Sequence, residues 1–314
     1  MSNQVDDFVA SLSAAERTSF YSLTGEEGSS GYRAVGRLLR AVECPVDSVV
    51  DALVPVAADR RLLVRIYDPK PAERLPLFIY LHGMCYSVGG WVVFALDSDD
   101  ALCRHLAHHA DAVVASVGYR LGCGYAFPDP LDDCLASIYW LMEHAETLGA
   151  RQGAVVLGGV SCGANLSAVA ARRLRDAGSE LAGQVLLCPI LDATMSHWTE
   201  RPGSADPILT ADDIRGYWAN YVTSPIAHAD PDVSPIFSDA LQSLPPALVI
   251  TAGLDLLREE GRAYAEQLRE AHNSVEARDY PGMVHDFIRF PGYFDCARDA
   301  VAEVGRFVRR VAGD

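Results

Sequence analysis

From residue 75 onwards, short stretches of strand length, most of them apolar, alternate with longer stretches of helical length. The strand-like runs span 75–81, 112–117, 154–158, 184–188, 247–252 and 275–280, and the helical stretches span 101–109, 131–148, 162–177, 259–271 and 293–312. Two further β-rich runs, 48–56 and 62–67, come before this alternation. Parallel strands need long crossovers, usually helices, and these helices bury both faces of the sheet. The alternation therefore predicts an α/β fold with a mostly parallel central sheet and helices on both faces.

Two segments do not follow this rhythm. Residues 1–45 are helical in pattern and precede every strand, so we expect them to form an N-terminal helical cap segment. The segment from about residue 196 to residue 234 is rich in turn residues and aromatic residues, which favours a lid or cap insertion. An ordinary long surface connection is the alternative. We expect residues 1–314 to form a single domain, since α/β domains of this size are common.

Charge and hydropathy exclude several classes of partner. The net charge is −16 and no block of Lys and Arg reverses it locally, so we expect no nucleic-acid partner. The N-terminus lacks the basic start and apolar run of a secretory signal, and no apolar stretch is long enough to span a bilayer. A cytoplasmic location without a membrane span is the expectation.

Eight cysteines are present, at positions 44, 85, 103, 123, 134, 162, 188 and 296. In a long chain without a secretory signal or a CxxC pair, free thiols are the expectation. Cys103, His105, His108 and His109 form the most metal-like local cluster, but no known ligand spacing completes it. We therefore predict neither a metal ion nor another cofactor.

The strongest chemical motif is Gly159-Val160-Ser161-Cys162-Gly163, which follows an apolar strand and opens a helical stretch. A serine on such a tight strand-to-helix turn is held in a strained backbone, with its hydroxyl projecting at the carboxyl edge of the sheet. Small residues on either side let the neighbouring chain pass, and the helix N-terminus favours developing negative charge. The motif predicts that Ser161 is a nucleophile.

A serine nucleophile needs a base, and His285 is the candidate. It lies on a short loop after the strand 275–280. His82 precedes the nucleophile, at the place where an oxyanion loop belongs, whereas His197 and His228 lie in the expected lid and stay open as alternatives.

The imidazole in turn needs a carboxylate that fixes its tautomer. Asp255 follows the strand 247–252, and the order Ser161, Asp255, His285 is the one found in α/β-hydrolases. A helix N-cap is the alternative role for Asp255. Asp286 is adjacent to His285 in sequence, so we do not expect it to orient the ring.

Backbone N–H groups must hold the developing oxyanion. The residue after the nucleophile, Cys162, is expected to supply one of them. Gly83 and Met84, on the loop after the strand 75–81, are expected to supply the others.

At these positions the chain resembles the hormone-sensitive-lipase-like family of α/β-hydrolase fold carboxylesterases, from about residue 45 to the C-terminus. The similar segments are LFIYLHG, VGYRL, FPDPLDDCLASIYWL, GGVSCGANLSA, SPIFSDALQSLPPALVITAGLDLLREEG and YPGMVHDF. The resemblance implies an N-terminal cap, a triad of Ser161, Asp255 and His285, and hydrolysis of short-to-medium acyl esters. Relatives in this family are often dimers, so a homodimer is an expectation that rests on the resemblance alone.

The chain departs from the family where the chemistry occurs. The family motif His-Gly-Gly-Gly is here His82-Gly83-Met84-Cys85, and the usual acidic residue before the nucleophile is Val160. Cys85, Cys123 and Cys162 are expected near the pocket, either as small apolar filling, which we favour, or as a thiol-lined site.

Three functions follow. The first is a serine carboxylesterase that cleaves small-molecule esters through an acyl-enzyme on Ser161. The altered oxyanion loop motivates the second, a non-hydrolytic tailoring enzyme (dehydratase, cyclase or lyase type) of secondary metabolism that uses the same pocket. The third is a catalytically inactive binding protein that keeps a ligand pocket.

Overall fold

The computed structural model describes residues 2–12, 44–83, 96–121, 124–198 and 206–313. The expectations for Met84, Cys85 and Cys123, and for most of the N-terminal cap segment, lie outside the described residues.

The described strands form one sheet in the order β1-β2-β4-β3-β5-β6-β7-β8. Their bounds are β1 (Ser48–Ala57), β2 (Arg60–Asp68), β3 (Leu75–Leu81), β4 (Val113–Gly118), β5 (Ala150–Val160), β6 (Gly183–Leu187), β7 (Ala247–Ala252) and β8 (Val275–Tyr280). Strand β2 is antiparallel to both β1 and β4, whereas every neighbouring pair from β4 to β8 is parallel. The prediction of a mostly parallel α/β sheet is confirmed.

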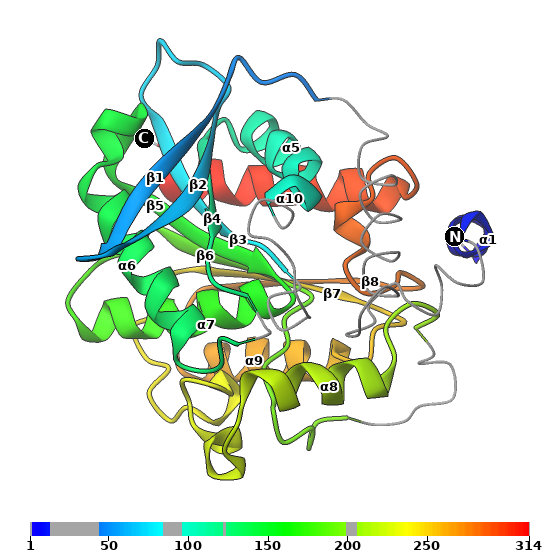
Figure 1. The fold of residues 1–314 in the computed structure, drawn as a ribbon. Helices are drawn as coiled ribbons and strands as arrows, with labels where there is room; N and C mark the ends of the chain where they lie inside the picture. The colour runs from blue at the N-terminus through cyan, green and yellow to red at the C-terminus, as the bar shows by residue number, and fades with distance from the viewer. Residues whose placement is uncertain (1, 13–43, 84–95, 122–123, 199–205, 314) are drawn as a thin grey trace.

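Helices cover both faces of this sheet. Their bounds are α1 (Ser2–Ser11), α5 (Asp100–Ala110), α6 (Asp129–Glu143), α7 (Cys162–Asp176), α8 (Ala211–Tyr221), α9 (Arg258–Glu270) and α10 (Asp295–Ala312). Figure 1 shows α5 and α10 together on one face, and α6, α7 and α9 on the other. Short 3-10 turns complete the chain at η1 (Ala145–Leu148), η2 (Pro225–Ala229), η3 (Pro235–Phe237) and η4 (Phe287–Arg289). Within the described residues, no helix is long and apolar enough to cross a membrane.

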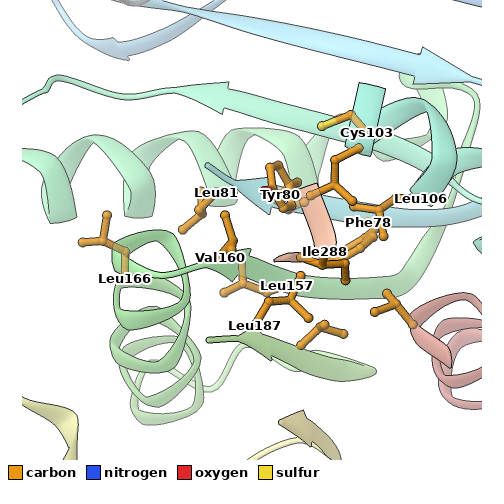
Figure 2. Close-up of a cluster of buried hydrophobic side chains, with 14 of the residues drawn as sticks. Phe78, Tyr80, Leu81, Cys103, Leu106, Leu157, Val160, Leu166, Leu187 and Ile288 are labelled. Atoms are coloured by element: carbon orange, nitrogen blue, oxygen red, sulfur yellow. The ribbon is translucent and has the colours of Figure 1, made fainter. Parts of the chain in front are cut away.

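The central strands are buried along their whole length, because helices cover them from both sides. Every residue of β3, β4, β6 and β7 is buried. Figure 2 shows part of this core, where side chains of β3 and β5 meet Cys103 and Leu106 of α5 and Ile288 of η4. At about 25 cal/mol per Å² of apolar surface, such burial dominates the stability of the fold. It also holds the carboxyl ends of β3, β5, β6 and β7 at one edge.

Two elements differ from the sequence-based expectation. The helix predicted over 131–148 ends at Glu143, and the 3-10 turn η1 follows it up to Leu148. The next residue, Gly149, adopts a left-handed conformation with φ 84°. Helix α8 lies inside the segment 196–234, for which the sequence analysis named no helix. Its N-terminus is a capping box, in which Thr210 and Asp213 exchange side-chain and backbone hydrogen bonds.

The segment around α8 packs against the rest of the core. Tyr217, Trp218 and Tyr221 are buried within the same hydrophobic cluster as the sheet residues, and the backbone N–H of Phe127 donates to the carbonyl of Tyr221. The aromatic residues that suggested a lid thus serve as packing groups. A lid role for residues 196–234 stays a prediction.

The turn between β5 and α7 makes a very close approach to the neighbouring strand. A Cβ on Gly163 would lie 2.0 Å from the carbonyl oxygen of Leu81 and 2.5 Å from that of His82, at the end of β3. A Cβ on Gly159 would lie 2.4 Å from the same Leu81 oxygen. Only glycine lets helix α7 start so close to β3, and this closeness fixes where Ser161 stands.

We expect Gly163→Ala to destabilise the protein by about 3 kcal/mol or more, because the new methyl group meets backbone atoms that cannot move alone. Gly83→Ala is the matched control. Its Cβ would meet a Val160 methyl group at 3.2 Å, which can shift, so a loss of about 1 kcal/mol is expected. Urea unfolding of both variants measures the difference. Equal losses would show that the close approach does not control the turn.

Candidate active site

Ser161 connects β5 to α7 and has φ 57° and ψ −117°. A non-glycine residue in this region is strained by about 1–3 kcal/mol, and it persists only when its surroundings hold it. Here the N–H of Ser161 donates to the carbonyl of Leu187 at 2.8 Å, and the carbonyl of Ser161 accepts from Ala164 and Asn165, both at 3.1 Å. The hydroxyl therefore sits at the N-terminus of α7, where the helix dipole favours negative charge.

The structure brings Ser161, His285 and Asp255 into one hydrogen-bonded row. Nε2 of His285 lies 3.0 Å from Oγ of Ser161, and Nδ1 lies 2.7 Å from Oδ2 of Asp255. Asp255 and His285 are 3% and 1% exposed. The second oxygen of Asp255 accepts the N–H of Leu257 at 2.9 Å, so the carboxylate is fixed in orientation. These are the three residues that the sequence motifs predicted to act together.

Backbone hydrogen bonds tie the loops that carry Asp255 and His285 to each other. The N–H of Gly253 donates to the carbonyl of Tyr280 at 2.9 Å, and the N–H of Leu254 donates to the carbonyl of Met283 at 2.9 Å. The two loops leave neighbouring parallel strands, β7 and β8, at the same edge of the sheet. A carboxylate and an imidazole 30 residues apart are thereby set at hydrogen-bonding distance.

The other histidines occupy different places. The ring of His82 is buried, stacks on Tyr119 with centroids 4.3 Å apart, and has Nδ1 2.8 Å from the carbonyl oxygen of Gly83. Nδ1 of His197 lies 2.7 Å from Oδ2 of Asp192. His82 thus packs under the loop that carries Gly83, and His285 is the histidine that contacts Ser161.

The electrostatic surroundings favour a protonated His285. Burial alone lowers its pKa, but the negative charges of Asp255 and Asp286 outweigh this and raise the pKa of His285 to about 9. An imidazole with carboxylates on two sides holds its proton well above neutral pH.

Asp206 is a site residue that the sequence analysis did not identify. Its Oδ2 accepts the backbone N–H of His285 at 2.5 Å, while Oδ1 accepts the N–H groups of Ile208 at 2.9 Å and Leu209 at 3.2 Å. Burial, together with the charge of Asp255, raises the pKa of Asp206 to about 7. An Asp-Pro dipeptide that caps its own turn was the visible signal, but nothing local pointed to the distant loop of His285.

Asp286 lies at the opposite nitrogen of the ring from Asp255. Its Oδ1 is 3.2 Å from Nε2 of His285, and its Oδ2 is 3.6 Å from Nη1 of Arg289. Arg289 pairs in turn with Asp99, with Nη2 to Oδ1 at 2.5 Å. The side chains of His285, Asp286, Arg289 and Asp99 are all buried. Asp286 therefore does not orient Nδ1, as expected, yet it contacts the ring where Ser161 does.

The expected oxyanion donors are partly within the described residues. Cys162 is the first residue of α7, and Gly83 follows the end of β3. A Cβ on Gly83 would lie 3.2 Å from Val160 and 3.7 Å from Oδ2 of Asp286, so this part of the loop runs close to both.

The expectation of free thiols is wrong for Cys162, which is disulfide-bonded. The other described cysteines, Cys44, Cys103, Cys134, Cys188 and Cys296, are free. A disulfide requires a Cα separation of about 4.4–6.8 Å, which sequence spacing cannot supply for residues on different loops. The first residue of α7 is therefore covalently fixed as well as hydrogen-bonded.

One set of atoms in the described part of the chain is close enough to hold a metal ion. The donor atoms of Cys188, Asp255 and His285 lie within 4.8 Å of one another. A cation there would have to displace the proton that Asp255 and His285 share. In the histidine cluster of α5, the rings of His105 and His109 stack 6.1 Å apart, and Cys103 is fully buried.

We expect Asp206→Ala to destabilise the protein by about 1–3 kcal/mol, since three buried backbone N–H groups lose an acceptor. Asp212→Ala, an exposed position in the same segment, is the control and is expected to change stability by less than about 0.5 kcal/mol. Thermal unfolding of the two variants checks this. A loss in Asp206→Ala no larger than the control would contradict the role given to the Asp206 carboxylate.

The chain is similar to known proteins over most of its length. A family model of the α/β hydrolase fold matches residues 78–289. An ethyl acetate hydrolase from Pseudomonas putida is 32% identical over 301 residues, which cover 94% of this chain and 93% of the relative. The carboxylesterase NlhH from Mycobacterium tuberculosis is 36% identical over 245 residues, covering 76% and 74%.

Among solved structures, a hyperthermophilic esterase from the archaeon Pyrobaculum calidifontis superimposes with a TM-score of 0.83 at 33% identity, over 90% of this chain and 92% of that one. The resemblance seen in the motifs is therefore confirmed. The chain belongs to the α/β hydrolase fold family, in its hormone-sensitive-lipase-like group of esterases.

Proposed function

We propose that this protein is a serine carboxylesterase that cleaves small-molecule esters through an acyl-enzyme on Ser161. The observation that carries the proposal is the row Ser161–His285–Asp255, with contacts of 3.0 and 2.7 Å, at the N-terminus of a helix. Relatives that match 94% and 76% of this chain are named as an ethyl acetate hydrolase and a carboxylesterase, which supports the same chemistry.

In the acylation step, Nε2 of His285 accepts the proton of the Ser161 hydroxyl while Oγ attacks the ester carbonyl carbon. The π electrons of the carbonyl move to its oxygen, and the backbone N–H groups of Gly83, Met84 and Cys162 are the donors proposed for it. Asp255 stabilises the imidazolium through Nδ1–H. Collapse of the intermediate expels the alcohol, which takes the proton from Nε2.

Deacylation repeats these moves with water. His285 removes a proton from water, the hydroxide oxygen attacks the acyl carbon, and Oγ of Ser161 leaves as it regains a proton from Nε2. The products are the carboxylic acid and the free enzyme. No cofactor is needed for any of these steps, because each one is a proton transfer or an acyl transfer.

The substrate class follows from the relatives and the chemistry. One relative is an ethyl acetate hydrolase, which points to short acyl groups and small alcohols for this chain as well. The named relatives favour hydrolysis over the non-hydrolytic and binding-protein alternatives. A cytoplasmic location, a homodimer and a lid over residues 196–234 stay predictions.

We expect a fluorophosphonate to add one phosphonyl group to the protein, on Ser161, with loss of fluoride. Ser161→Ala should take up no label and should lose about 10⁴-fold or more in kcat for p-nitrophenyl acetate. Ser167→Ala is the control, since its hydroxyl donates to the carbonyl of Gly163 within α7, away from the row. Intact-mass measurement and peptide mapping give the result. An unlabelled wild-type protein would remove the proposal.

We also expect an alkaline pH profile. The reactive form of the enzyme has a neutral His285. Because the pKa of His285 is raised to about 9, this histidine is protonated in most molecules at pH 7. Below this pKa, kcat/KM for a neutral ester should rise about tenfold per pH unit and then level off above it. Measurement of kcat/KM between pH 6 and 10 checks this. A plateau already reached at pH 7 would contradict it.

A further inference from the structure

The buried carboxylate of Asp286 is not used by the triad mechanism, although it is nearly as close to the reacting nitrogen as the serine is. Within the described residues, Oγ of Ser161 lies 3.0 Å from Nε2 of His285, and Oδ1 of Asp286 lies 3.2 Å from the same nitrogen. In the triad mechanism this nitrogen must be free to accept the proton of Ser161. A protonated Nε2–H, by contrast, is attracted to the carboxylate. The two neighbours therefore favour opposite protonation states of the same atom.

We propose that Asp286 is a second carboxylate partner of His285, which competes with Ser161 for Nε2 and thereby sets the pH above which the serine can be activated. This inference rests on the proposed hydrolase function and deepens it. At low pH the proton stays on Nε2 beside Asp286, and the serine is unactivated. Once that proton is lost, Nε2 accepts from Ser161 and hydrolysis proceeds.

Other titratable and charged groups face His285 from the elements around it. Asp255 approaches from the loop after β7, Asp206 from the segment before α8, and the Cys188 thiol from the end of β6. Arg289 of η4 is a cation close to Asp286 in the described part of the chain, and it also pairs with Asp99 ahead of α5. Asp255 accepts a hydrogen bond from Nδ1–H of His285, and Asp206 accepts one from the backbone N–H of His285. Asp286 is the carboxylate placed against Nε2.

The position of Asp286 suits this role. It adopts a left-handed backbone with φ 57°, which Asp and Asn tolerate better than most residues. This bend turns the side chain back toward the ring of the preceding residue. The pKa of Asp286 is raised overall, chiefly by burial and further by the negative charges of Asp99 and Asp255, whereas the charges of His285 and Arg289 lower it. The imidazolium and the guanidinium therefore offset part of the cost of burying the carboxylate.

The same geometry makes Asp286→Asn a clean test. Asn fits the left-handed backbone and keeps the shape of the side chain while it removes the charge. Arg289 keeps its partner Asp99, with Nη2 and Nε at 2.5 and 2.7 Å from Oδ1, so no buried cation is stranded. Asp286→Gly also suits φ 57° and removes the side chain altogether. The two variants differ in the shape of the side chain, but both remove the negative charge of Asp286.

The readout is the second-order rate of fluorophosphonate inactivation between pH 5 and 10, together with kcat/KM for p-nitrophenyl acetate. We call the acid limb the part of the pH–rate profile in which the rate rises with pH. For both Asp286 variants we expect this limb to move to lower pH by about one unit or more, because His285 loses one close opposite charge. Near pH 7 each variant should then react about tenfold faster than the wild type, while the rates on the alkaline plateau stay similar. Activation by removal of a buried charged residue is not expected from a merely structural role.

Asp279→Asn is the matched control. It makes the same change on β8, at a carboxylate that pairs with Arg258 and accepts from Thr251, and its acid limb should match the wild type. An unmoved limb in the Asp286 variants, or a uniform loss at every pH, would overturn the inference. If the acid limb of the wild-type profile gives an apparent pKa at or below the ordinary value for histidine, the inference is overturned without any variant. A wild-type protein that never labels at Ser161 would instead refute the hydrolase function itself.

Discussion

The close approach of helix α7 to strand β3 is the constraint on which the site depends. Glycine at 159 and 163 lets the helix begin against the backbone of Leu81 and His82, with no room for a methyl group. Ser161 is then forced into a positive-φ conformation, and its hydroxyl projects at the carboxyl edge of the sheet. Because β5, β7 and β8 are parallel in one sheet, the loops that carry Asp255 and His285 end at the same edge. Packing thus decides the placement of the reactive atoms.

The second feature of the site is its concentration of buried negative charge. Asp206, Asp255 and Asp286 surround one imidazole, and Arg289 partly offsets them. Carboxylates are costly to bury unless they are paired or hydrogen-bonded. Here the three carboxylates make different contacts, since Asp255 orients the ring, Asp206 holds the backbone of His285, and Asp286 contacts Nε2. Together their negative charges favour the protonated form of His285.

Prediction from sequence succeeded where a local pattern carries the information. The strands 75–81, 247–252 and 275–280 have the predicted bounds. The first two are buried and read as continuous apolar runs with clear ends. Prediction failed where the outcome depends on distant contacts. Helix α8 was missed because its aromatic residues stand among turn residues in the sequence, and the surface against which they pack is known only from the fold. The disulfide at Cys162 was missed because pairing depends on Cα distance.

The sequence by itself determined the α/β class, the strand–serine–helix turn and the identity of the three residues in the row. These follow from hydrophobic period and from motifs in which the physical requirement is local. The tertiary structure alone decided which carboxylates reach His285 and at which atom. Asp286 is adjacent in the chain yet lies at Nε2, and Asp206 is 79 residues away yet holds the backbone of His285. Such contacts depend on a side-chain direction and on a loop position, and the fold sets both by burying the apolar surfaces around them.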